Sequence, residues 1–235
     1  MPGNHYWVCS ACGQRALTPG ATAQPGAVAC RNSWCAAADR PLGAVHSVGA
    51  YHGALRRAIV AYKYGADLRW AQLFGRLVHT FLARHANWFE EFGVICPVPS
   101  FSGPGARRSW GHVELFCAEV GWLAGAEWPV EQLVSKVAET QPMSAKPQPV
   151  RRRIAREALA GALVVTRPEQ VRGRRVVVVD DVCASGQTLL AVARALRQAG
   201  AAEVTGLVLA RASWHPGRSR AAPGPPRVPV TSPGP

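Results

Sequence analysis

The sequence predicts an α/β protein with a parallel sheet flanked by helices and a small cysteine-rich segment at its N-terminus. Two runs near the C-terminus, RRVVVVD and EVTGLVLA, consist mostly of aliphatic residues, and a helical pattern lies between them. A strand, helix, strand order with strands that are apolar throughout is typical of parallel strands covered on both faces. The 235 residues, 48% of them hydrophobic, suffice for one main domain with a small appendage.

The first half of the chain alternates helical and extended patterns. Apolar residues recur at helical spacing over residues 55–62 and again over 70–81, which predicts two amphipathic helices broken near Gly65. VICPVP, residues 94–99, predicts a short buried strand that ends in a proline-rich loop. Helical spacing returns over residues 113–123, so we expect a third helix there.

The second half begins with a polar stretch. KVAETQPMSAKPQPV, residues 136–150, holds three prolines and few large apolar groups, so we expect an exposed loop and a candidate lid. A helix is expected over the arginine-rich stretch that follows, and then strands at 161–166 and 174–180, with a turn at VRG between them. The next helix is expected to stop at Gly200, and a further strand to cover 203–210.

Composition divides the chain into three parts. We expect a four-cysteine segment over residues 1–40, a main domain over 44–213 and a disordered tail rich in proline and glycine over 214–235. The apolar stretches are too short to span a membrane, and the N-terminus lacks the pattern of a signal peptide, so we expect a cytoplasmic protein with no membrane partner. The formal charge of +13 favours polyanionic or phosphorylated partners, although a solvated basic surface accounts for it equally well.

The cysteines near the N-terminus form two pairs. Cys9 and Cys12 make a C-x-x-C turn, and Cys30 and Cys35 follow after seventeen residues. Two such turns can supply four thiolates to a tetrahedral Zn²⁺ ion, so we expect a structural, zinc-ribbon-like segment. A reduced, flexible N-terminus is the alternative, because the second pair is widely spaced. Three other cysteines in apolar surroundings are expected to be ordinary buried thiols: Cys96, Cys117 and Cys183.

The run VVVVDDVCASGQTLL contains the strongest functional signal. Parallel strands present functional groups at their carboxyl ends, where Asp180 and Asp181 lie. The following small-residue turn, residues 184–188, offers consecutive backbone N–H groups at the start of a helix, an arrangement that binds phosphate. Acids for hydroxyl groups and amides for a phosphate, a few residues apart, predict a site for a sugar phosphate.

Two other interpretations of this run are weaker. Receiver domains of signalling proteins also open with an apolar strand and two acids, but too few residues follow Asp181 for such a domain. An ordinary buried strand followed by a helix capped at Ser185 leaves the two adjacent carboxylates unexplained.

The same run resembles the phosphoribosyl pyrophosphate signature of type I phosphoribosyltransferases. The resemblance implies that the acid pair binds the ribose hydroxyls and that the loop holds the 5′-phosphate. Cys183 stands where an aliphatic residue is usual, and Ala184 where a Thr or Ser is common. The fold class that this implies is a type I phosphoribosyltransferase-like parallel sheet.

Further motifs resemble the ComF family, which is associated with competence and DNA uptake. They are the N-terminal cysteines, YHGALRRAIVAYKYG, CPVPS with a basic loop, and the acid pair, and together they span residues 9–213. The resemblance places Lys63, Arg107 and Arg108 near the diphosphate. Trp110, Gly111 and His112 match the family pattern only in part, and His112 is the one histidine singled out. The residues thereby assigned to substrate binding are Lys63, Arg107, Arg108, Asp180, Asp181, Val182, Cys183, Ala184, Ser185, Gly186, Gln187 and Thr188.

Two functions follow from the resemblance. In the first, an enzyme binds phosphoribosyl pyrophosphate with Mg²⁺, orients the ribose through Asp180 and Asp181, and transfers the phosphoribosyl group to a nitrogen acceptor. In the second, a nonenzymatic accessory protein for DNA uptake keeps the fold as a sensor or scaffold, with single-stranded DNA or a DNA-uptake helicase as partner. A purely DNA-binding zinc protein is a third interpretation, which leaves the acid pair unexplained.

Overall fold

The structure is a computed structural model that describes three short N-terminal stretches and most of the chain from residue 39 to residue 212. The residues it describes are 9, 11–13, 35, 39–65, 67–104, 106, 110–140 and 157–212. Its helices and strands are β1 (Val45–Ala50), α1 (Gly53–Gly65), α2 (Arg69–Arg84), α3 (Ala86–Phe89), β2 (Val94–Pro97), α4 (His112–Ala124), β3 (Val134–Lys136), β4 (Leu163–Val165), α6 (Pro168–Val171), β5 (Arg175–Cys183), α7 (Gln187–Gln198) and β6 (Glu203–Arg211).

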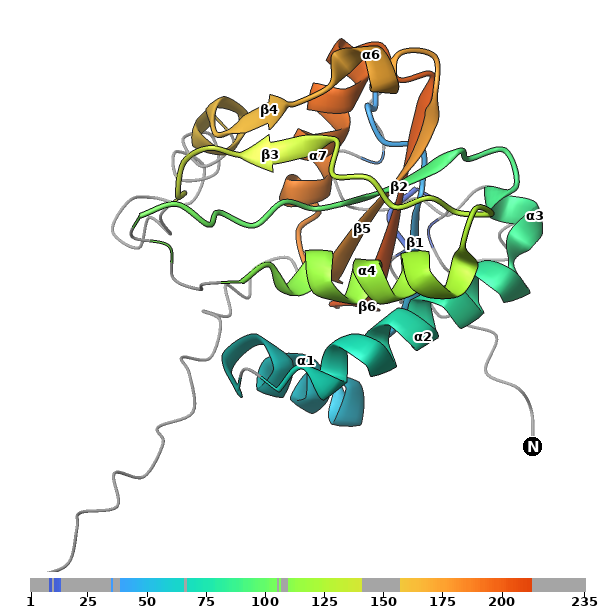
Figure 1. The fold of residues 1–235 in the computed structure, drawn as a ribbon, viewed down its shortest axis with the longest axis vertical. Helices are drawn as coiled ribbons and strands as arrows, with labels where there is room; N and C mark the ends of the chain where they lie inside the picture. Colours follow the sequence, from blue (N-terminus) through green and yellow to red (C-terminus); the bar gives the residue numbers. More distant parts are fainter. Residues whose placement is uncertain are drawn as a thin grey trace, which may run out of the picture.

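The centre of the molecule is a four-stranded parallel sheet. Its strand order is β1-β6-β5-β2, so β5 and β6 occupy the middle and all neighbours run in the same direction (Figure 1). The four valines Val176–Val179 of β5 are all buried, which explains the nearly continuous apolar sequence. The carboxyl ends of the strands therefore meet at one edge of the sheet, where Asp180 and Asp181 lie.

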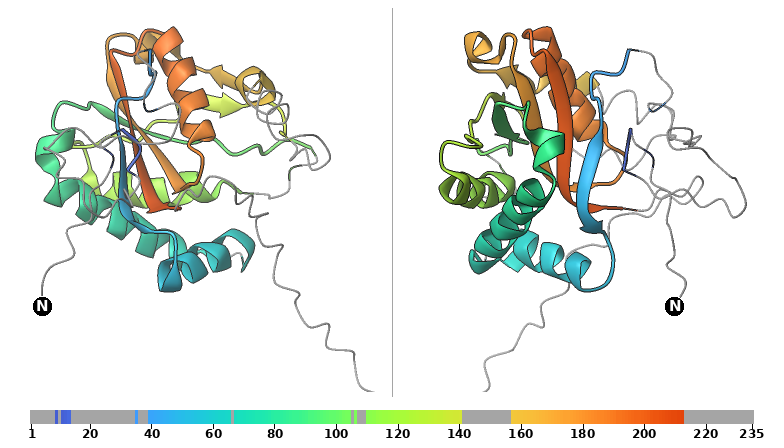
Figure 2. Two further views of the ribbon diagram at one scale, coloured as in Figure 1. Left: turned by 180° about the vertical axis from the view of Figure 1, so that it is seen from behind. Right: turned by 90° about the vertical axis from the view of Figure 1, so that its right-hand side faces the viewer.

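Helices cover both faces of this sheet. Side chains of α1, α2 and α4 form one buried cluster with Val177 and Val179, and side chains of α7 form another with Val176 and Val178. The opposite views in Figure 1 and the left panel of Figure 2 show α4 in front of one face and α7 in front of the other. The expected α/β fold with a parallel sheet flanked by helices is confirmed. Among the described helices, none combines the length and apolar content that a membrane crossing requires.

A second, smaller sheet lies beside α7. It consists of β3 and β4, which pair antiparallel from Val134 opposite Val165 to Lys136 opposite Leu163. The sequence led us to expect a loop from residue 136 onward, but Lys136 still belongs to the strand. Residues 141–150 of the candidate lid lie outside the described residues, and so do the arginines at 151–153 and 156.

Most expected elements are present. The helices expected over 55–62, 70–81 and 113–123 correspond to α1, α2 and α4, and Gly200 follows α7 with a positive φ of 97°. The turn expected at VRG follows a short helix, α6, which the sequence did not predict. Strand β1 was also missed, because VHSVGA mixes polar and small residues and only Val45 of the six is fully buried. Instead, β1 is held in place by the hydrogen bonds between its backbone and that of β6.

The packing of α2 on α4 yields a stability prediction. A Cβ added at Gly75 of α2 would lie 2.4 Å from Cβ of Glu119 and 2.8 Å from the carbonyl oxygen of Phe116, whereas one added at Gly65 would meet nothing within 4 Å. Both substitutions to Ala gain helix propensity, so their difference isolates the steric cost. We expect Gly75→Ala to be less stable than Gly65→Ala by about 2 kcal/mol in urea unfolding. Equal stabilities would mean that the helices separate freely.

Candidate functional site

The two acids lie at the end of the central strand β5. Asp180 is opposite Val208 of β6 in the register, and the strand ends at Cys183. Asp181 is buried, with 3% of its surface exposed, whereas Asp180 is half-buried. The N–H of Asp181 donates to Oδ1 of Asp180 at 2.8 Å. The two neighbouring carboxylates therefore have different surroundings.

Asp181 is held by two side chains from the helical layer. Nζ of Lys63, in the last turn of α1, lies 2.5 Å from Oδ2 of Asp181, and Nε2 of His112 lies 2.6 Å from the same oxygen. Because an ionised carboxylate can only accept, Nε2 of His112 is the donor. The hydroxyl of Tyr62, which is buried, donates to the carbonyl oxygen of His112 at 2.7 Å. These contacts join α1, α4 and β5 at one point.

The surroundings shift the pKa values of the two acids in opposite directions. Burial opposes ionisation of Asp181, but the charge of Lys63 and the hydrogen bond from His112 outweigh it and hold the pKa of Asp181 well below its usual range. Burial and the adjacent charge of Asp181 raise the pKa of Asp180 to about 8. At neutral pH Asp181 is thus an anion with partners inside the protein, and Asp180 is mostly protonated.

The loop between β5 and α7 is open to solvent at its tip. Ala184 and Ser185 are exposed, and Gly186 is buried with φ at 80°, a conformation that favours glycine. Gly186 is the N-cap residue of α7, and no side chain caps this helix. The N–H of Gln187 donates to Oγ of Ser185, and this hydrogen bond is long, at 3.4 Å. The positive end of a twelve-residue helix and several backbone N–H groups therefore lie beside exposed small residues.

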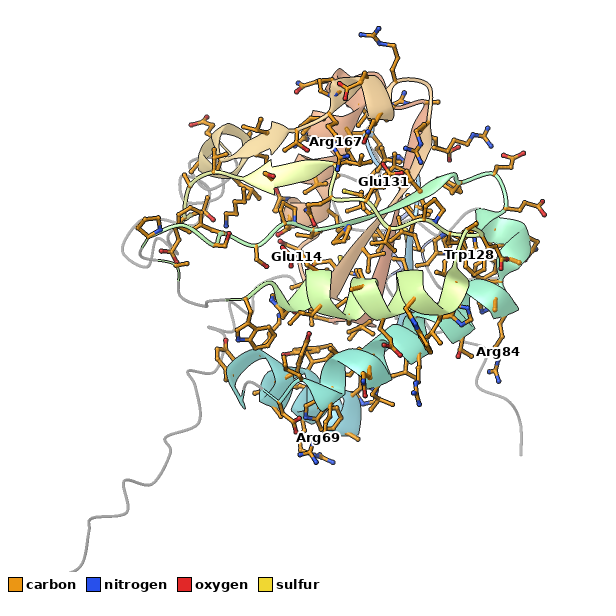
Figure 3. All side chains as sticks on the ribbon, in the orientation of Figure 1. Arg69, Arg84, Glu114, Trp128, Glu131 and Arg167 are labelled. Carbon is orange, nitrogen blue, oxygen red and sulfur yellow. The ribbon has the colours of Figure 1, made fainter. Side chains whose placement is uncertain are left out.

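The segment after β2 is fixed against the start of α4. The carboxylate of Glu114 accepts from the backbone N–H of Ser100 at 2.6 Å and from its hydroxyl at 3.1 Å. Figure 3 labels Glu114 between α4 and this segment. The ring of Trp110 lies 5.2 Å from that of Tyr62, so the residues ahead of α4 also pack on α1. Both contacts place His112 beside Asp181.

The sequence-predicted residues are brought together in part. Lys63, both acids and the loop 184–188 lie at the same edge of the sheet, but Nζ of Lys63 is occupied by Asp181. Val182 and Thr188 are half-buried, and Cys183 is buried. Burial raises the pKa of the Cys183 thiol to about 11, so this thiol is neutral and unreactive. Arg107 and Arg108 lie outside the described residues.

The sequence singled out His112 without assigning it to this site, and it gave Tyr62 no role there. The contact of His112 with Asp181 spans 69 residues, and the only signal was the partial match at Trp110 to His112. Tyr62 is one of the apolar residues at helical spacing over 55–62, and the hydrogen bond from its hydroxyl to α4 has no sequence signal. The three expected buried thiols are indeed buried, and burial raises the pKa of Cys96 to about 11 and that of Cys117 well above its usual value.

Three of the four N-terminal cysteines converge. The Sγ atoms of Cys9, Cys12 and Cys35 all lie within 4.8 Å of one another, and Cys30 lies outside the described residues. Thiolates on a tetrahedral Zn²⁺ ion are about 3.5 to 4 Å apart, so these three sulfur atoms could bind zinc after moving slightly closer together. The N–H of Gly13 donates to the carbonyl oxygen of Cys9 at 2.9 Å, which closes the C-x-x-C turn. This cysteine turn, Cys9 to Gly13, packs in the same core as α7.

The family comparison identifies the C-terminal part of the site. Residues 131–223 match the phosphoribosyl transferase domain, a stretch that contains β3 to β6, both acids and the loop before α7. This stretch of the chain is therefore similar to a phosphoribosyl transferase domain, and it contains the run in which the sequence resembles the type I signature. Lys63 and His112 lie outside the matched stretch. A comparison with curated proteins finds no match.

Several solved structures resemble parts of the chain. An allosteric regulatory enzyme of purine biosynthesis is 23% identical, with 59% of this chain and 26% of that chain covered and a TM-score of 0.37. A glutamine phosphoribosylpyrophosphate amidotransferase from B. subtilis is 22% identical over 59% and 26%, with a TM-score of 0.35. A hypoxanthine phosphoribosyltransferase from Staphylococcus aureus is 8% identical over 59% and 62%, with a TM-score of 0.37. The chain thus spans about a quarter of the first two structures.

The ion pair between Lys63 and Asp181 yields a second prediction. Lys63→Met leaves a buried carboxylate with His112 alone, which we expect to cost about 2 kcal/mol of unfolding free energy. In an Asp181→Asn background the same change should cost much less, so a double-mutant cycle should give a coupling of about 1 to 2 kcal/mol. Urea unfolding measures it. The exposed pair of Asp67 and Arg69 is the control, and there the cycle should give less than about 0.5 kcal/mol.

The raised pKa of Asp180 yields a third prediction. Between the ordinary value of 3.8 and about 8, the folded state keeps a proton that the unfolded state releases, so Asp180 makes stability fall as pH rises through this window. Asp180→Asn removes this dependence. We expect the variant to exceed the native protein at pH 8.5 by about 2 kcal/mol, or roughly 4 to 8 °C in Tm, and to differ little at pH 4. If the unfolding free energies of Asp180→Asn and the native protein differ by the same amount at every pH from 4 to 8.5, the raised pKa of Asp180 is contradicted.

Proposed function

We propose that the chain binds phosphoribosyl pyrophosphate, or a related sugar phosphate, at the carboxyl end of β5. The observation that carries the proposal is the junction of a buried parallel strand that ends in two carboxyl groups with an exposed, glycine-containing turn at the start of α7. The match of residues 131–223 to the phosphoribosyl transferase domain supports the same substrate class.

The proposed roles follow from exposure and charge. The 5′-phosphate accepts hydrogen bonds from the backbone N–H groups of residues 184–188, where the exposed Ala184 and Ser185 leave room for an anion. Asp180, half-buried and at the end of the strand, accepts from a ribose hydroxyl once it is ionised. Asp181, already bound to Lys63 and His112, fixes the position of the strand end and adds negative charge beneath the sugar.

The diphosphate requires cations. Lys63 lies close enough to lower the pKa of Asp180 as well as to pair with Asp181, so its charge acts on the whole site. We assign Lys63, with Arg107 and Arg108, to the diphosphate. Asp180 and Asp181 offer the carboxylate oxygens that Mg²⁺ prefers, and a bound Mg²⁺ ion neutralises charge on the diphosphate.

The reaction that this arrangement supports is phosphoribosyl transfer. As the bond from C1 of the ribose to the diphosphate lengthens, positive charge grows on the ring, and the nearby carboxylates stabilise it. A nitrogen acceptor then forms the new bond at C1 and the diphosphate leaves. The N-terminal cysteines and the Lys-Tyr-Gly and Pro-Val-Pro motifs favour a ComF-like protein within this class.

A binding module without turnover is the second candidate. The observation that favours it is the neutralisation of Asp181 by partners inside the protein, which leaves Asp180 as the more accessible acid. In this function the fold serves as a sensor or scaffold for DNA uptake. Both candidates require the same ligand site, and they differ in whether diphosphate is released.

Calorimetry with phosphoribosyl pyrophosphate and Mg²⁺ tests the proposal. Asp180→Asn removes the ionisable ribose contact, so we expect its affinity at pH 8 to fall by about tenfold to a hundredfold. The matched control is Glu169→Gln on α6, at the opposite end of β5, which should bind like the native protein. Equal affinities of Asp180→Asn and the native protein would show that Asp180 does not contact the ligand. If neither protein binds phosphoribosyl pyrophosphate, the proposal is wrong.

A turnover assay separates the two candidates. The native protein is incubated with phosphoribosyl pyrophosphate, Mg²⁺ and a panel of purine bases, pyrimidine bases and amines, and diphosphate release is measured. Release that depends on an acceptor identifies the enzyme. Binding with a thermal shift but no release identifies the sensor, and binding of single-stranded DNA that weakens steeply with salt adds the DNA-uptake role.

A further inference from the structure

We propose that Arg211 is a positioning residue that couples the cysteine turn to the phosphate-binding loop. This inference rests on the proposed function of that loop. Arg211 itself does not contact the ligand in this proposal. Instead, metal binding at Cys9, Cys12 and Cys35 orders the start of the loop through the Arg211 guanidinium and thereby raises the affinity for a sugar phosphate.

The contacts of Arg211 join two segments that are distant in sequence. Arg211 is the last residue of β6, and only 5% of its surface is exposed. Its Nε donates to the carbonyl oxygen of Cys12 at 2.7 Å, across 199 residues. Its Nη1 donates to the carbonyl oxygens of Cys183 and Ala184, both at 2.6 Å. One rigid, planar group thus binds the metal-ligand turn on one side and the first loop residues on the other.

The charge of Arg211 calls for an anionic neighbour. Among the described residues no carboxylate forms an ion pair with Arg211, and its Nη2 is buried without a hydrogen-bond partner there. A buried charge without an opposite charge is costly. Three thiolates on a divalent ion carry a net charge of −1, and four carry −2. The cysteine cluster with its ion is therefore the negative partner that this guanidinium lacks among the described side chains.

The cysteine turn lies close against the sheet. The N–H of Gly13 closes the turn on Cys9, with φ at 65°, and a Cβ at Gly13 would lie 2.5 Å from the carbonyl oxygen of Val45 in β1. The turn is therefore pressed against the sheet. On the other side, the carbonyl oxygen of Cys183 also accepts from the N–H of Ala212 at 2.9 Å, so the end of β5 is held by the segment that carries Arg211.

Amide hydrogen exchange tests the coupling without any ligand. In the native full-length protein, removal of zinc with a chelator should speed exchange at residues 183–188 by about tenfold, whereas exchange in α2 should stay unchanged. In Arg211→Met the same amides should already exchange fast with zinc bound. Unchanged protection of residues 183–188 after zinc removal would overturn the proposal, and this arm needs no variant that folds.

Ligand binding tests the consequence for function. With ribose 5-phosphate as the probe, zinc-loaded native protein should bind about ten times more tightly than zinc-free protein, and the ratio should fall to about one in Arg211→Met. By reciprocity the ligand should slow zinc release to a chelator in the native protein and not in the variant. The matched control is Arg197→Met, because Arg197 also donates to backbone carbonyls, those of Ala201 and Ala202, but far from the loop. It should keep the native ratio.

The outcomes separate this inference from the proposed function. If zinc protects the loop from exchange but neither ribose 5-phosphate nor phosphoribosyl pyrophosphate binds, the coupling is supported and the proposed function is wrong. If the ligand binds with the same affinity with and without zinc, the proposed function is supported and the coupling is wrong. A zinc-dependent ratio that persists unchanged in Arg211→Met also removes Arg211 as the link.

Discussion

Two carboxyl groups at the end of a strand that is buried on both faces are the constraint on which this structure depends. A carboxylate in such a place is stable only when an opposite charge reaches it or when it keeps its proton. The protein uses both solutions side by side. Lys63 and His112 keep Asp181 ionised, and Asp180 responds by holding a proton near neutral pH. Two identical side chains thereby acquire different chemistry, and the helical layer becomes part of the site.

The family match divides the site between two halves of the chain. The acids, the loop and α7 lie within residues 131–223, whereas Lys63 and His112 come from α1 and α4 before that stretch. The matched part carries the features expected to hold the sugar and its phosphate. The preceding part carries the groups that decide how much negative charge remains at the strand end.

The sequence predicted those elements whose burial leaves a regular pattern. The valines of β5 and the amphipathic faces of α2 and α7 belong to this group, and so do the acids and the loop, because strand, turn and helix follow one another directly. Strand β1 has no such pattern, since its order comes from backbone pairing with a strand more than 150 residues later. The contacts of Lys63 and His112 with Asp181 could not be predicted for the same reason. No sequence pattern singled out Arg211, and the folded chain shows it buried.

Strand order determines when this sheet can be completed. β6 separates β1 from β5, so the first strand has no partner in the main sheet until the last one has left the ribosome. At 5 to 20 residues per second, translation from Ala50 to Arg211 takes on the order of ten seconds. During that interval β1 lacks the neighbour with which it pairs in the folded sheet, and unpaired strand edges favour pairing with other chains. A ribosome stalled before residue 203 yields a product without β6, the strand that joins β1 to β5 in the sheet.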